Sequence, residues 1–329
     1  MILDFFQHRD IKRFVFILFC ITILFWQKII VFHEIISPQP IIPADKILNS
    51  FTGSNIYLLA FAKVLLLLIC SYAFIIILSV HNVLPNRKYL AVVLFLSVVS
   101  VFIDGQNIVN NLFALFFHLF AFYNLFSTYR SDNVKSHVFI AAFLTGISIM
   151  FSFPFVVAII NLLTALLIFG IITRRTIISV ILGLITPFVF LLYFFRLAYH
   201  DVSSMLHAIK NNFDNLFFIT FDFDDFTPFF MGFVFLVTCF SILKISNSKH
   251  TKSVQKMTDQ IFYFTVITSA FITIFVSGLK PYGIMFFGIS AAYLITRFSQ
   301  LVRRERIAEI IVFMILIAAI VYNNYTLLF

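Results

Sequence analysis

The sequence predicts an all-α fold of about eleven transmembrane helices, which form a single membrane domain over residues 1–329. Two independent observations predict this fold. Hydrophobic residues make up 62% of the chain and charged residues only 11%, whereas a soluble domain has about 25% charged residues. Long apolar runs also recur along the chain and are separated by short polar breaks. Because water cannot solvate a surface with so few charges, we expect lipid to cover much of it.

Each apolar run meets or approaches the length that a membrane helix requires. A helix needs about 20 predominantly apolar residues to cross the hydrocarbon core of a bilayer. The expected spans are 14–32, 57–79, 89–103, 108–127, 137–152, 155–173, 177–197, 228–244, 259–278, 283–298 and 308–326.

Polar or proline-containing breaks decide how the longest apolar stretches are divided. The stretch 137–173 is too long for one crossing, and Pro154 disfavours a helical conformation at the residue before it. We therefore expect two spans joined by a turn at Ser152-Phe153-Pro154, and a similar turn at 104–107. The first run, 14–32, is not followed by a small-residue cleavage site. It is expected to be a retained span and not a signal peptide.

The basic residues predict the orientation of these spans. If the N-terminus is cytoplasmic, alternate loops should be basic, and 17 of the 23 basic residues fall in those loops. An odd number of spans then places the C-terminus in the periplasm. The net charge of +9 is therefore an orientation signal, and nucleic-acid binding is not expected. The 17 residues are Arg9, Lys12, Arg13, Arg87, Lys88, Arg130, Lys135, Arg174, Arg175, Lys244, Lys249, Lys252, Lys256, Arg297, Arg303, Arg304 and Arg306.

No sequence motif names a reaction. The chain has no P-loop, no glycine-rich dinucleotide fingerprint and no HExxH pattern, which disfavours ATP hydrolysis, dinucleotide chemistry and zinc proteolysis. Its three cysteines, Cys20, Cys70 and Cys239, lie in apolar runs without a second ligand at metal spacing. They are expected to be small buried hydrophobic residues.

Polar groups inside the expected spans are candidates for substrate binding, because charges within a membrane are costly. Lys63 lies about two turns inside its span, where it could either line a pocket or extend its ammonium group to the outer interface. Asn107, Asn111 and His118 fall on one face of a helix. That face could form hydrogen bonds between helices or line a polar cavity near mid-membrane.

Charged groups in the expected outer loops are the other candidates. Asp222, Asp224 and Asp225 lie within four residues and could bind a divalent cation or supply a general base; the alternative is a solvated acidic loop. Asp45 lies in a proline-rich first outer loop. Arg196 and Lys280 could hold an anion near the outer surface, or could simply occupy a span end and a turn.

Several short segments resemble an uncharacterised inner-membrane family of the Bacteroidota. The resemblance covers roughly the second to the seventh expected span and implies a role in the cell envelope. The segments are Asp104-Gly-Gln-Asn107-Ile-Val-Asn110-Asn111-Leu-Phe, Phe151-Ser-Phe-Pro154, Arg174-Arg175 and Gly183-Leu-Ile-Thr-Pro187.

The architecture also resembles polyprenyl-phosphate-dependent membrane glycosyltransferases and O-antigen polymerases. In the glycosyltransferases the first outer loop typically supplies a catalytic acid, which implies that role for Asp45 or Glu34 here. The polymerases use basic residues at the outer face, for which Arg196 and Lys280 are the candidates. This chain departs from the glycosyltransferase pattern in its short first loop and in having no soluble domain.

Three functions remain open from the sequence. The protein could transfer or polymerise sugars from a polyprenyl-linked donor at the periplasmic face of the bacterial inner membrane. It could instead transport or flip a lipid-linked or small substrate. It could also be a non-enzymatic subunit of an envelope complex.

Overall fold

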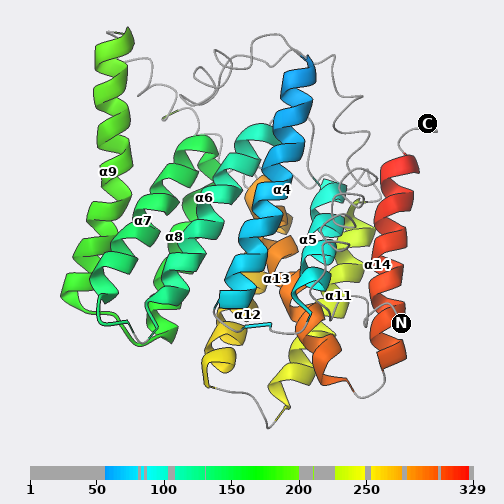
Figure 1. The fold of residues 1–329 in the computed structure, drawn as a ribbon. Coiled ribbons are helices and arrows are strands. Elements are labelled where there is room, and N and C mark those ends of the chain that lie inside the picture. Colours follow the sequence, from blue (N-terminus) through cyan, green and yellow to red (C-terminus); the bar gives the residue numbers. More distant parts are fainter. Residues whose placement is uncertain are drawn as a thin grey trace.

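Helices form the protein throughout the part of the chain that the structure describes, and no strand occurs there (Figure 1). The structure is a computed structural model. It describes residues 56–80, 83–84, 87–102, 108–129, 131–199, 210, 227–248, 253–275, 280–302 and 305–325. The helices are α4 (Ile56–Val80), α5 (Lys88–Phe102), α6 (Ile108–Ser127), α7 (Val134–Phe151), the 3₁₀ helix η1 (Phe153–Val157), α8 (Ala158–Ile168), α9 (Arg174–Tyr199), α11 (Thr227–Ser246), α12 (Ser253–Phe275), α13 (Lys280–Leu301) and α14 (Glu305–Tyr325).

The all-α fold class is confirmed for this part of the chain. Each expected span from 57–79 to 308–326 overlaps a helix, and the helix 108–127 has the expected bounds. The expected span 155–173 covers η1 and α8 and extends beyond the end of α8 at Ile168. By length and composition, five described helices are long and apolar enough to cross a membrane, and two shorter helices are also apolar. The total of eleven spans and the orientation of the termini stay predictions. The first expected span, 14–32, lies outside the described residues.

The break at Pro154 has the predicted effect on the chain. Helix α7 ends at Phe151, and Ser152 takes an extended conformation with φ −148° and ψ 107°. The proline then occupies the first turn of η1, where its missing N–H costs no helical hydrogen bond. The sequence 137–173 is therefore two helical segments, as the proline indicated.

A glycine ends helix α8 and lets the chain reverse into α9. Gly170 has a φ of +68°, a conformation that side chains with a Cβ rarely adopt. Its N–H donates to the carbonyl of Leu167 at 3.0 Å, and the N–H of Ile171 donates to the carbonyl of Leu166 at 3.1 Å. These two bonds form a Schellman motif, which satisfies carbonyls that the helix end would otherwise leave unpaired.

Helices α5 and α13 form the centre of the bundle. Every residue from 90 to 101 and from 285 to 299 is buried. Helix α5 packs against α13, α14 and α4, and α13 packs against α12, α11 and α5 (Figure 1). A helix that is apolar on all sides is covered either by neighbouring helices or by lipid. The burial of α5 shows that neighbouring helices cover it.

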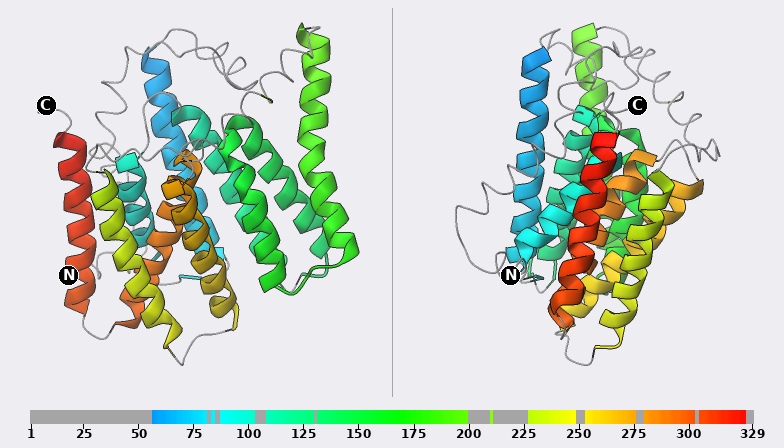
Figure 2. Two further views of the ribbon diagram at one scale, coloured as in Figure 1. Left: turned by 180° about the vertical axis from the view of Figure 1, so that it is seen from behind. Right: turned by 90° about the vertical axis from the view of Figure 1, so that its right-hand side faces the viewer.

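Unlike the buried helices α5 and α13, helix α9 lies at one edge of the bundle, across from α14 (Figure 2). It packs on α7 through two glycines. A Cβ on Gly183 would lie 2.6 Å from the carbonyl oxygen of Phe139, and a Cβ on Gly146 would lie 2.8 Å from the ring of Pro187. Small residues allow such close helix contacts in membranes. The outward side chains of α9, among them Phe190, are exposed and apolar, as a lipid-facing helix requires.

Candidate functional site

The predicted polar face of α6 turns toward the interior of the bundle. Asn111 is half-buried, and its Oδ1 accepts a hydrogen bond from the hydroxyl of Ser152 at 2.8 Å. His118 is buried, with 3% of its surface exposed. Asn107, the third member of the predicted stripe, lies outside the described residues. The face therefore serves in part to bond α6 to the turn after α7, which is the interhelical alternative that the sequence left open.

His118 lies among aromatic rings from three other positions. Its ring centroid is 4.3 Å from that of Phe286, 4.8 Å from that of Phe122 and 6.1 Å from that of Phe155, all in edge-to-face geometry. Neither imidazole nitrogen has a hydrogen-bond partner within the described part of the chain. The side chain is thus held by ring packing, and its polar atoms are left without direct protein partners there.

A small cavity lies beside His118. Its volume is about 10 Å³, close to the lower limit for one water molecule. Two further polar side chains reach it from other helices, Thr145 from α7 and Asn161 from α8. The remaining lining residues are Ala121, Phe122, Leu125 and Leu162.

Lys63 is a buried cation on α4. Only 1% of its surface is exposed, and the side chain has no hydrogen bond or ion pair with any residue that the structure describes. Seven residues further along α4, the thiol of Cys70 donates to the carbonyl of Leu112 at 3.6 Å. Because residues seven apart share a helix face, Lys63 lies on the side of α4 that meets α6. The two alternatives for Lys63, a pocket and extension to the outer interface, stay predictions.

The structure describes only some of the other residues that the sequence analysis singled out. Arg196 lies in the last turn of α9 and is exposed. Lys280 is the first residue of α13, but its side chain is not described. Asp45, Asp222, Asp224 and Asp225 lie outside the described residues, so their catalytic roles stay predictions. No group of three or more metal-binding side chains occurs among the described residues, and the divalent cation also stays a prediction for the outer loops.

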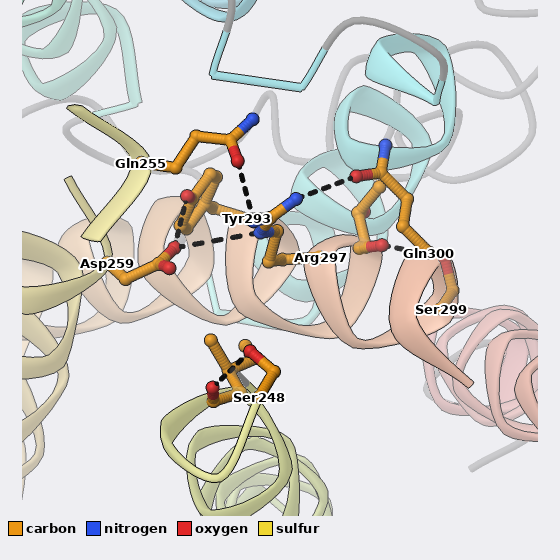
Figure 3. A network of polar contacts seen from close by, with 9 residues as sticks. Ser248, Gln255, Asp259, Tyr293, Arg297, Ser299 and Gln300 are labelled. Atoms are coloured by element: carbon orange, nitrogen blue, oxygen red, sulfur yellow. Dashed lines mark hydrogen bonds and ion pairs between the residues drawn. The ribbon is translucent and has the colours of Figure 1, made fainter. Parts of the chain in front are cut away.

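Sequence reasoning missed a buried polar cluster between α12 and α13 (Figure 3). The Tyr293 hydroxyl donates to Oδ1 of Asp259 at 2.5 Å, and Nε of Arg297 lies 4.0 Å from the same oxygen. Two glutamines complete the cluster. Arg297 donates from Nη2 to Gln255 at 2.9 Å and from Nη1 to Gln300 at 3.3 Å. We call these five residues the α12–α13 cluster.

The α12–α13 cluster neutralises charges that would be expensive to bury alone. Asp259 exposes 3% of its surface and Arg297 exposes 6%. Taking one such charge out of water costs several kcal/mol unless a partner and further hydrogen bonds compensate. The phenol, the two amide oxygens and the opposite charge supply most of this compensation and fasten two neighbouring helices. Nε of Arg297 and the amide nitrogen of Gln300 have no hydrogen-bond partner within the described part of the chain.

A signal in the sequence could have revealed this pair. Asp259 is the first residue of the expected span 259–278, and Arg297 is the last residue but one of the next expected span, 283–298. In an antiparallel helical hairpin, residues equally far from the turn lie at the same level. Arg297 was used only as one of the basic residues that predict the orientation, and Asp259 was given no role.

Comparisons with known proteins give no relative for this chain. No protein family matches it, and no curated protein or solved structure matches it either. The resemblances to the Bacteroidota family, to membrane glycosyltransferases and to O-antigen polymerases therefore stay predictions from the sequence.

Proposed function

We propose that the chain is an integral inner-membrane protein of the bacterial cell envelope that binds a polyprenyl-phosphate-linked sugar and transfers or polymerises it at the periplasmic face. The observation that carries this proposal is the burial of Lys63 without an anionic partner among the described residues. A buried ammonium group is unfavourable unless an anion neutralises it. A lipid phosphate is an anion that could reach this position from within the bilayer if α4 and α6 separate.

The position of Lys63 fits a lipid-borne anion better than a dissolved one. Helix α4 is long and apolar enough to span the membrane, and Lys63 lies about two turns from its first residue, Ile56. The phosphate of a polyprenyl lipid lies at a similar depth, at the boundary of headgroups and acyl chains. Lys63 would hold that phosphate while its polyprenyl tail remains in lipid.

The reaction itself would depend on the outer loops. A carboxylate of Asp45, Asp222, Asp224 or Asp225 would take the proton of the acceptor hydroxyl as a general base. The sugar would then pass to that oxygen, and the polyprenyl phosphate would leave with its negative charge held by Lys63, assisted by Arg196 or Lys280. This division of labour is an inference from the residue types.

A second candidate function is transport or flipping of a lipid-linked or small substrate. The observation that favours it is the position of His118 and its cavity inside the bundle, among α6, α7 and α8. A polar group surrounded by helices can belong to a pathway across the membrane. In this case Lys63 would bind the substrate, and the cavity beside His118 would have to widen before a substrate could enter it.

Binding of polyprenyl monophosphate to the purified chain in lipid nanodiscs tests the role of Lys63. Native mass spectrometry or a fluorescent polyprenyl phosphate would report the affinity. We expect Lys63→Gln to weaken binding at least about tenfold, which corresponds to about 1.4 kcal/mol, and Lys63→Arg to retain most of it. Lys88→Gln is the matched control, because Lys88 begins α5 at the other end of the bundle (Figure 1). Equal binding by Lys63→Gln and the unaltered chain would contradict the proposal.

Surface glycans then separate the two candidate functions. Strains that carry single Asp→Asn substitutions at positions 45, 222, 224 and 225 should lose glycan chain length or amount if the protein is a transferase. Normal glycans in all four strains would exclude the enzymatic role and would leave transport as the function to test, by movement of labelled polyprenyl phosphate between leaflets.

A further inference from the structure

The imidazole of His118 carries an unsatisfied hydrogen-bonding requirement in the middle of the bundle. A neutral histidine has one N–H donor and one nitrogen acceptor. Within the described part of the chain both nitrogens of His118 are buried and unpartnered. Burying such a group without a partner costs about 1–3 kcal/mol. The surrounding phenylalanine rings offer only weak N–H···π contacts, and they offer no donor for the acceptor nitrogen.

The cavity beside His118 has the size and the chemistry to hold a hydrogen-bonding partner for the imidazole. Its volume of about 10 Å³ suits one water molecule and excludes larger ligands. The Thr145 hydroxyl donates to the carbonyl of Ala141 at 2.9 Å, which leaves its oxygen able to accept. Oδ1 of Asn161 accepts a bond from the Thr268 hydroxyl at 3.3 Å and has a second lone pair. A buried water needs two to four polar partners, and His118, Thr145 and Asn161 are the three polar residues that line the cavity.

We propose that His118, Thr145 and Asn161 form a binding site for a single water molecule. The imidazole N–H would donate to the water oxygen, and the two water protons would go to the Thr145 hydroxyl oxygen and to Oδ1 of Asn161. Such a molecule joins three helices, α6, α7 and α8, by hydrogen bonds. A metal ion is a poorer occupant, because no cluster of metal-binding side chains occurs among the described residues. The site does not depend on the function proposed above.

Solid-state NMR of the chain in nanodiscs, with ¹⁵N-labelled histidine, tests the site. The chain has eight histidines, and His118→Phe identifies the signal of His118 by its loss. We expect magnetisation to pass from water protons to the His118 ring. The double variant Thr145→Val with Asn161→Leu should lose this transfer, since it removes the two groups that hold the water.

Thr164→Val is the matched control. Thr164 also lies on α8, but its hydroxyl donates to the carbonyl of Ile160 at 2.8 Å and does not line the cavity. It should leave the transfer unchanged. Absence of transfer in the unaltered chain would show a dry site and would overturn the proposal, whether or not the variants fold. Transfer that persists in a folded double variant would also overturn it, because the water would then be held elsewhere.

Discussion

Two buried polar regions of the molecule differ in how completely their groups are paired. In the α12–α13 cluster, Asp259 and Arg297 have each other, a phenol and two amides as partners. Lys63 and His118, on α4 and α6, are as deeply buried but have no hydrogen-bond partner in the described part of the chain. Pairing indicates a structural role, since the protein meets the cost by itself. Its absence indicates a place that a ligand or a water molecule completes.

The largest expected change in stability comes from a substitution in the α12–α13 cluster. Replacing Asp259 with leucine leaves Arg297 buried without a counter-charge, which typically costs about 3–5 kcal/mol. We expect a correspondingly lower free energy of unfolding, measured by denaturant titration in detergent micelles. The double variant Asp259→Leu with Arg297→Met should recover most of the loss, because an apolar pair of similar volume can replace a buried ion pair. A double variant as unstable as the single one would contradict a pairwise role.

Lys63→Met should raise the free energy of unfolding, whereas Asp259→Leu lowers it. If Lys63 lacks an anionic partner in the ligand-free protein, an apolar side chain of similar length should stabilise it by about 1–2 kcal/mol. The same titration in detergent, without added lipid phosphate, measures this change. A clear loss of stability would show that the protein itself supplies a counter-ion, and the reason for a bound anion would disappear.

The smallest expected change in stability comes from the uncharged hydrogen bond between Ser152 and Asn111. Ser152→Ala removes the donor to Oδ1 of Asn111, which should lower the free energy of unfolding by about 1 kcal/mol. Ser79→Ala is a suitable comparison, because that hydroxyl bonds only to its own helix, at the carbonyl of Ile76. Equal losses of stability in the two variants would mean that the hydrogen bond between α6 and the turn after α7 does not contribute to the free energy of unfolding.

The sequence predicted the helices well because apolar length is a local property. The break at Ser152-Phe153-Pro154 could also be predicted, since proline acts on its immediate neighbours. The α12–α13 cluster was missed for a physical reason. Helix α12 begins at Ser253, before the expected span 259–278, so Asp259 lies well inside the helix and not at its first residue. Which helices surround α5 depends on packing between distant segments, and apolar runs alone carry no such information.

The central helix α5 also constrains how the protein is assembled during synthesis. Its packing partners α13 and α14 lie near the end of the chain. Helix α5 is therefore surrounded by lipid until α13 and α14 have been synthesised and inserted. It can remain in lipid because its polar groups are satisfied internally: the hydroxyl of Ser97 donates to Val93 and that of Ser100 to Ser97. Arg297 of α13 would be costly in lipid without a counter-charge. Its partner Asp259 lies on α12, the preceding helix, and therefore enters the membrane first. Asp259 and Arg297 thus lie on consecutive helices, and the two charges of this pair can neutralise each other as soon as α13 is made.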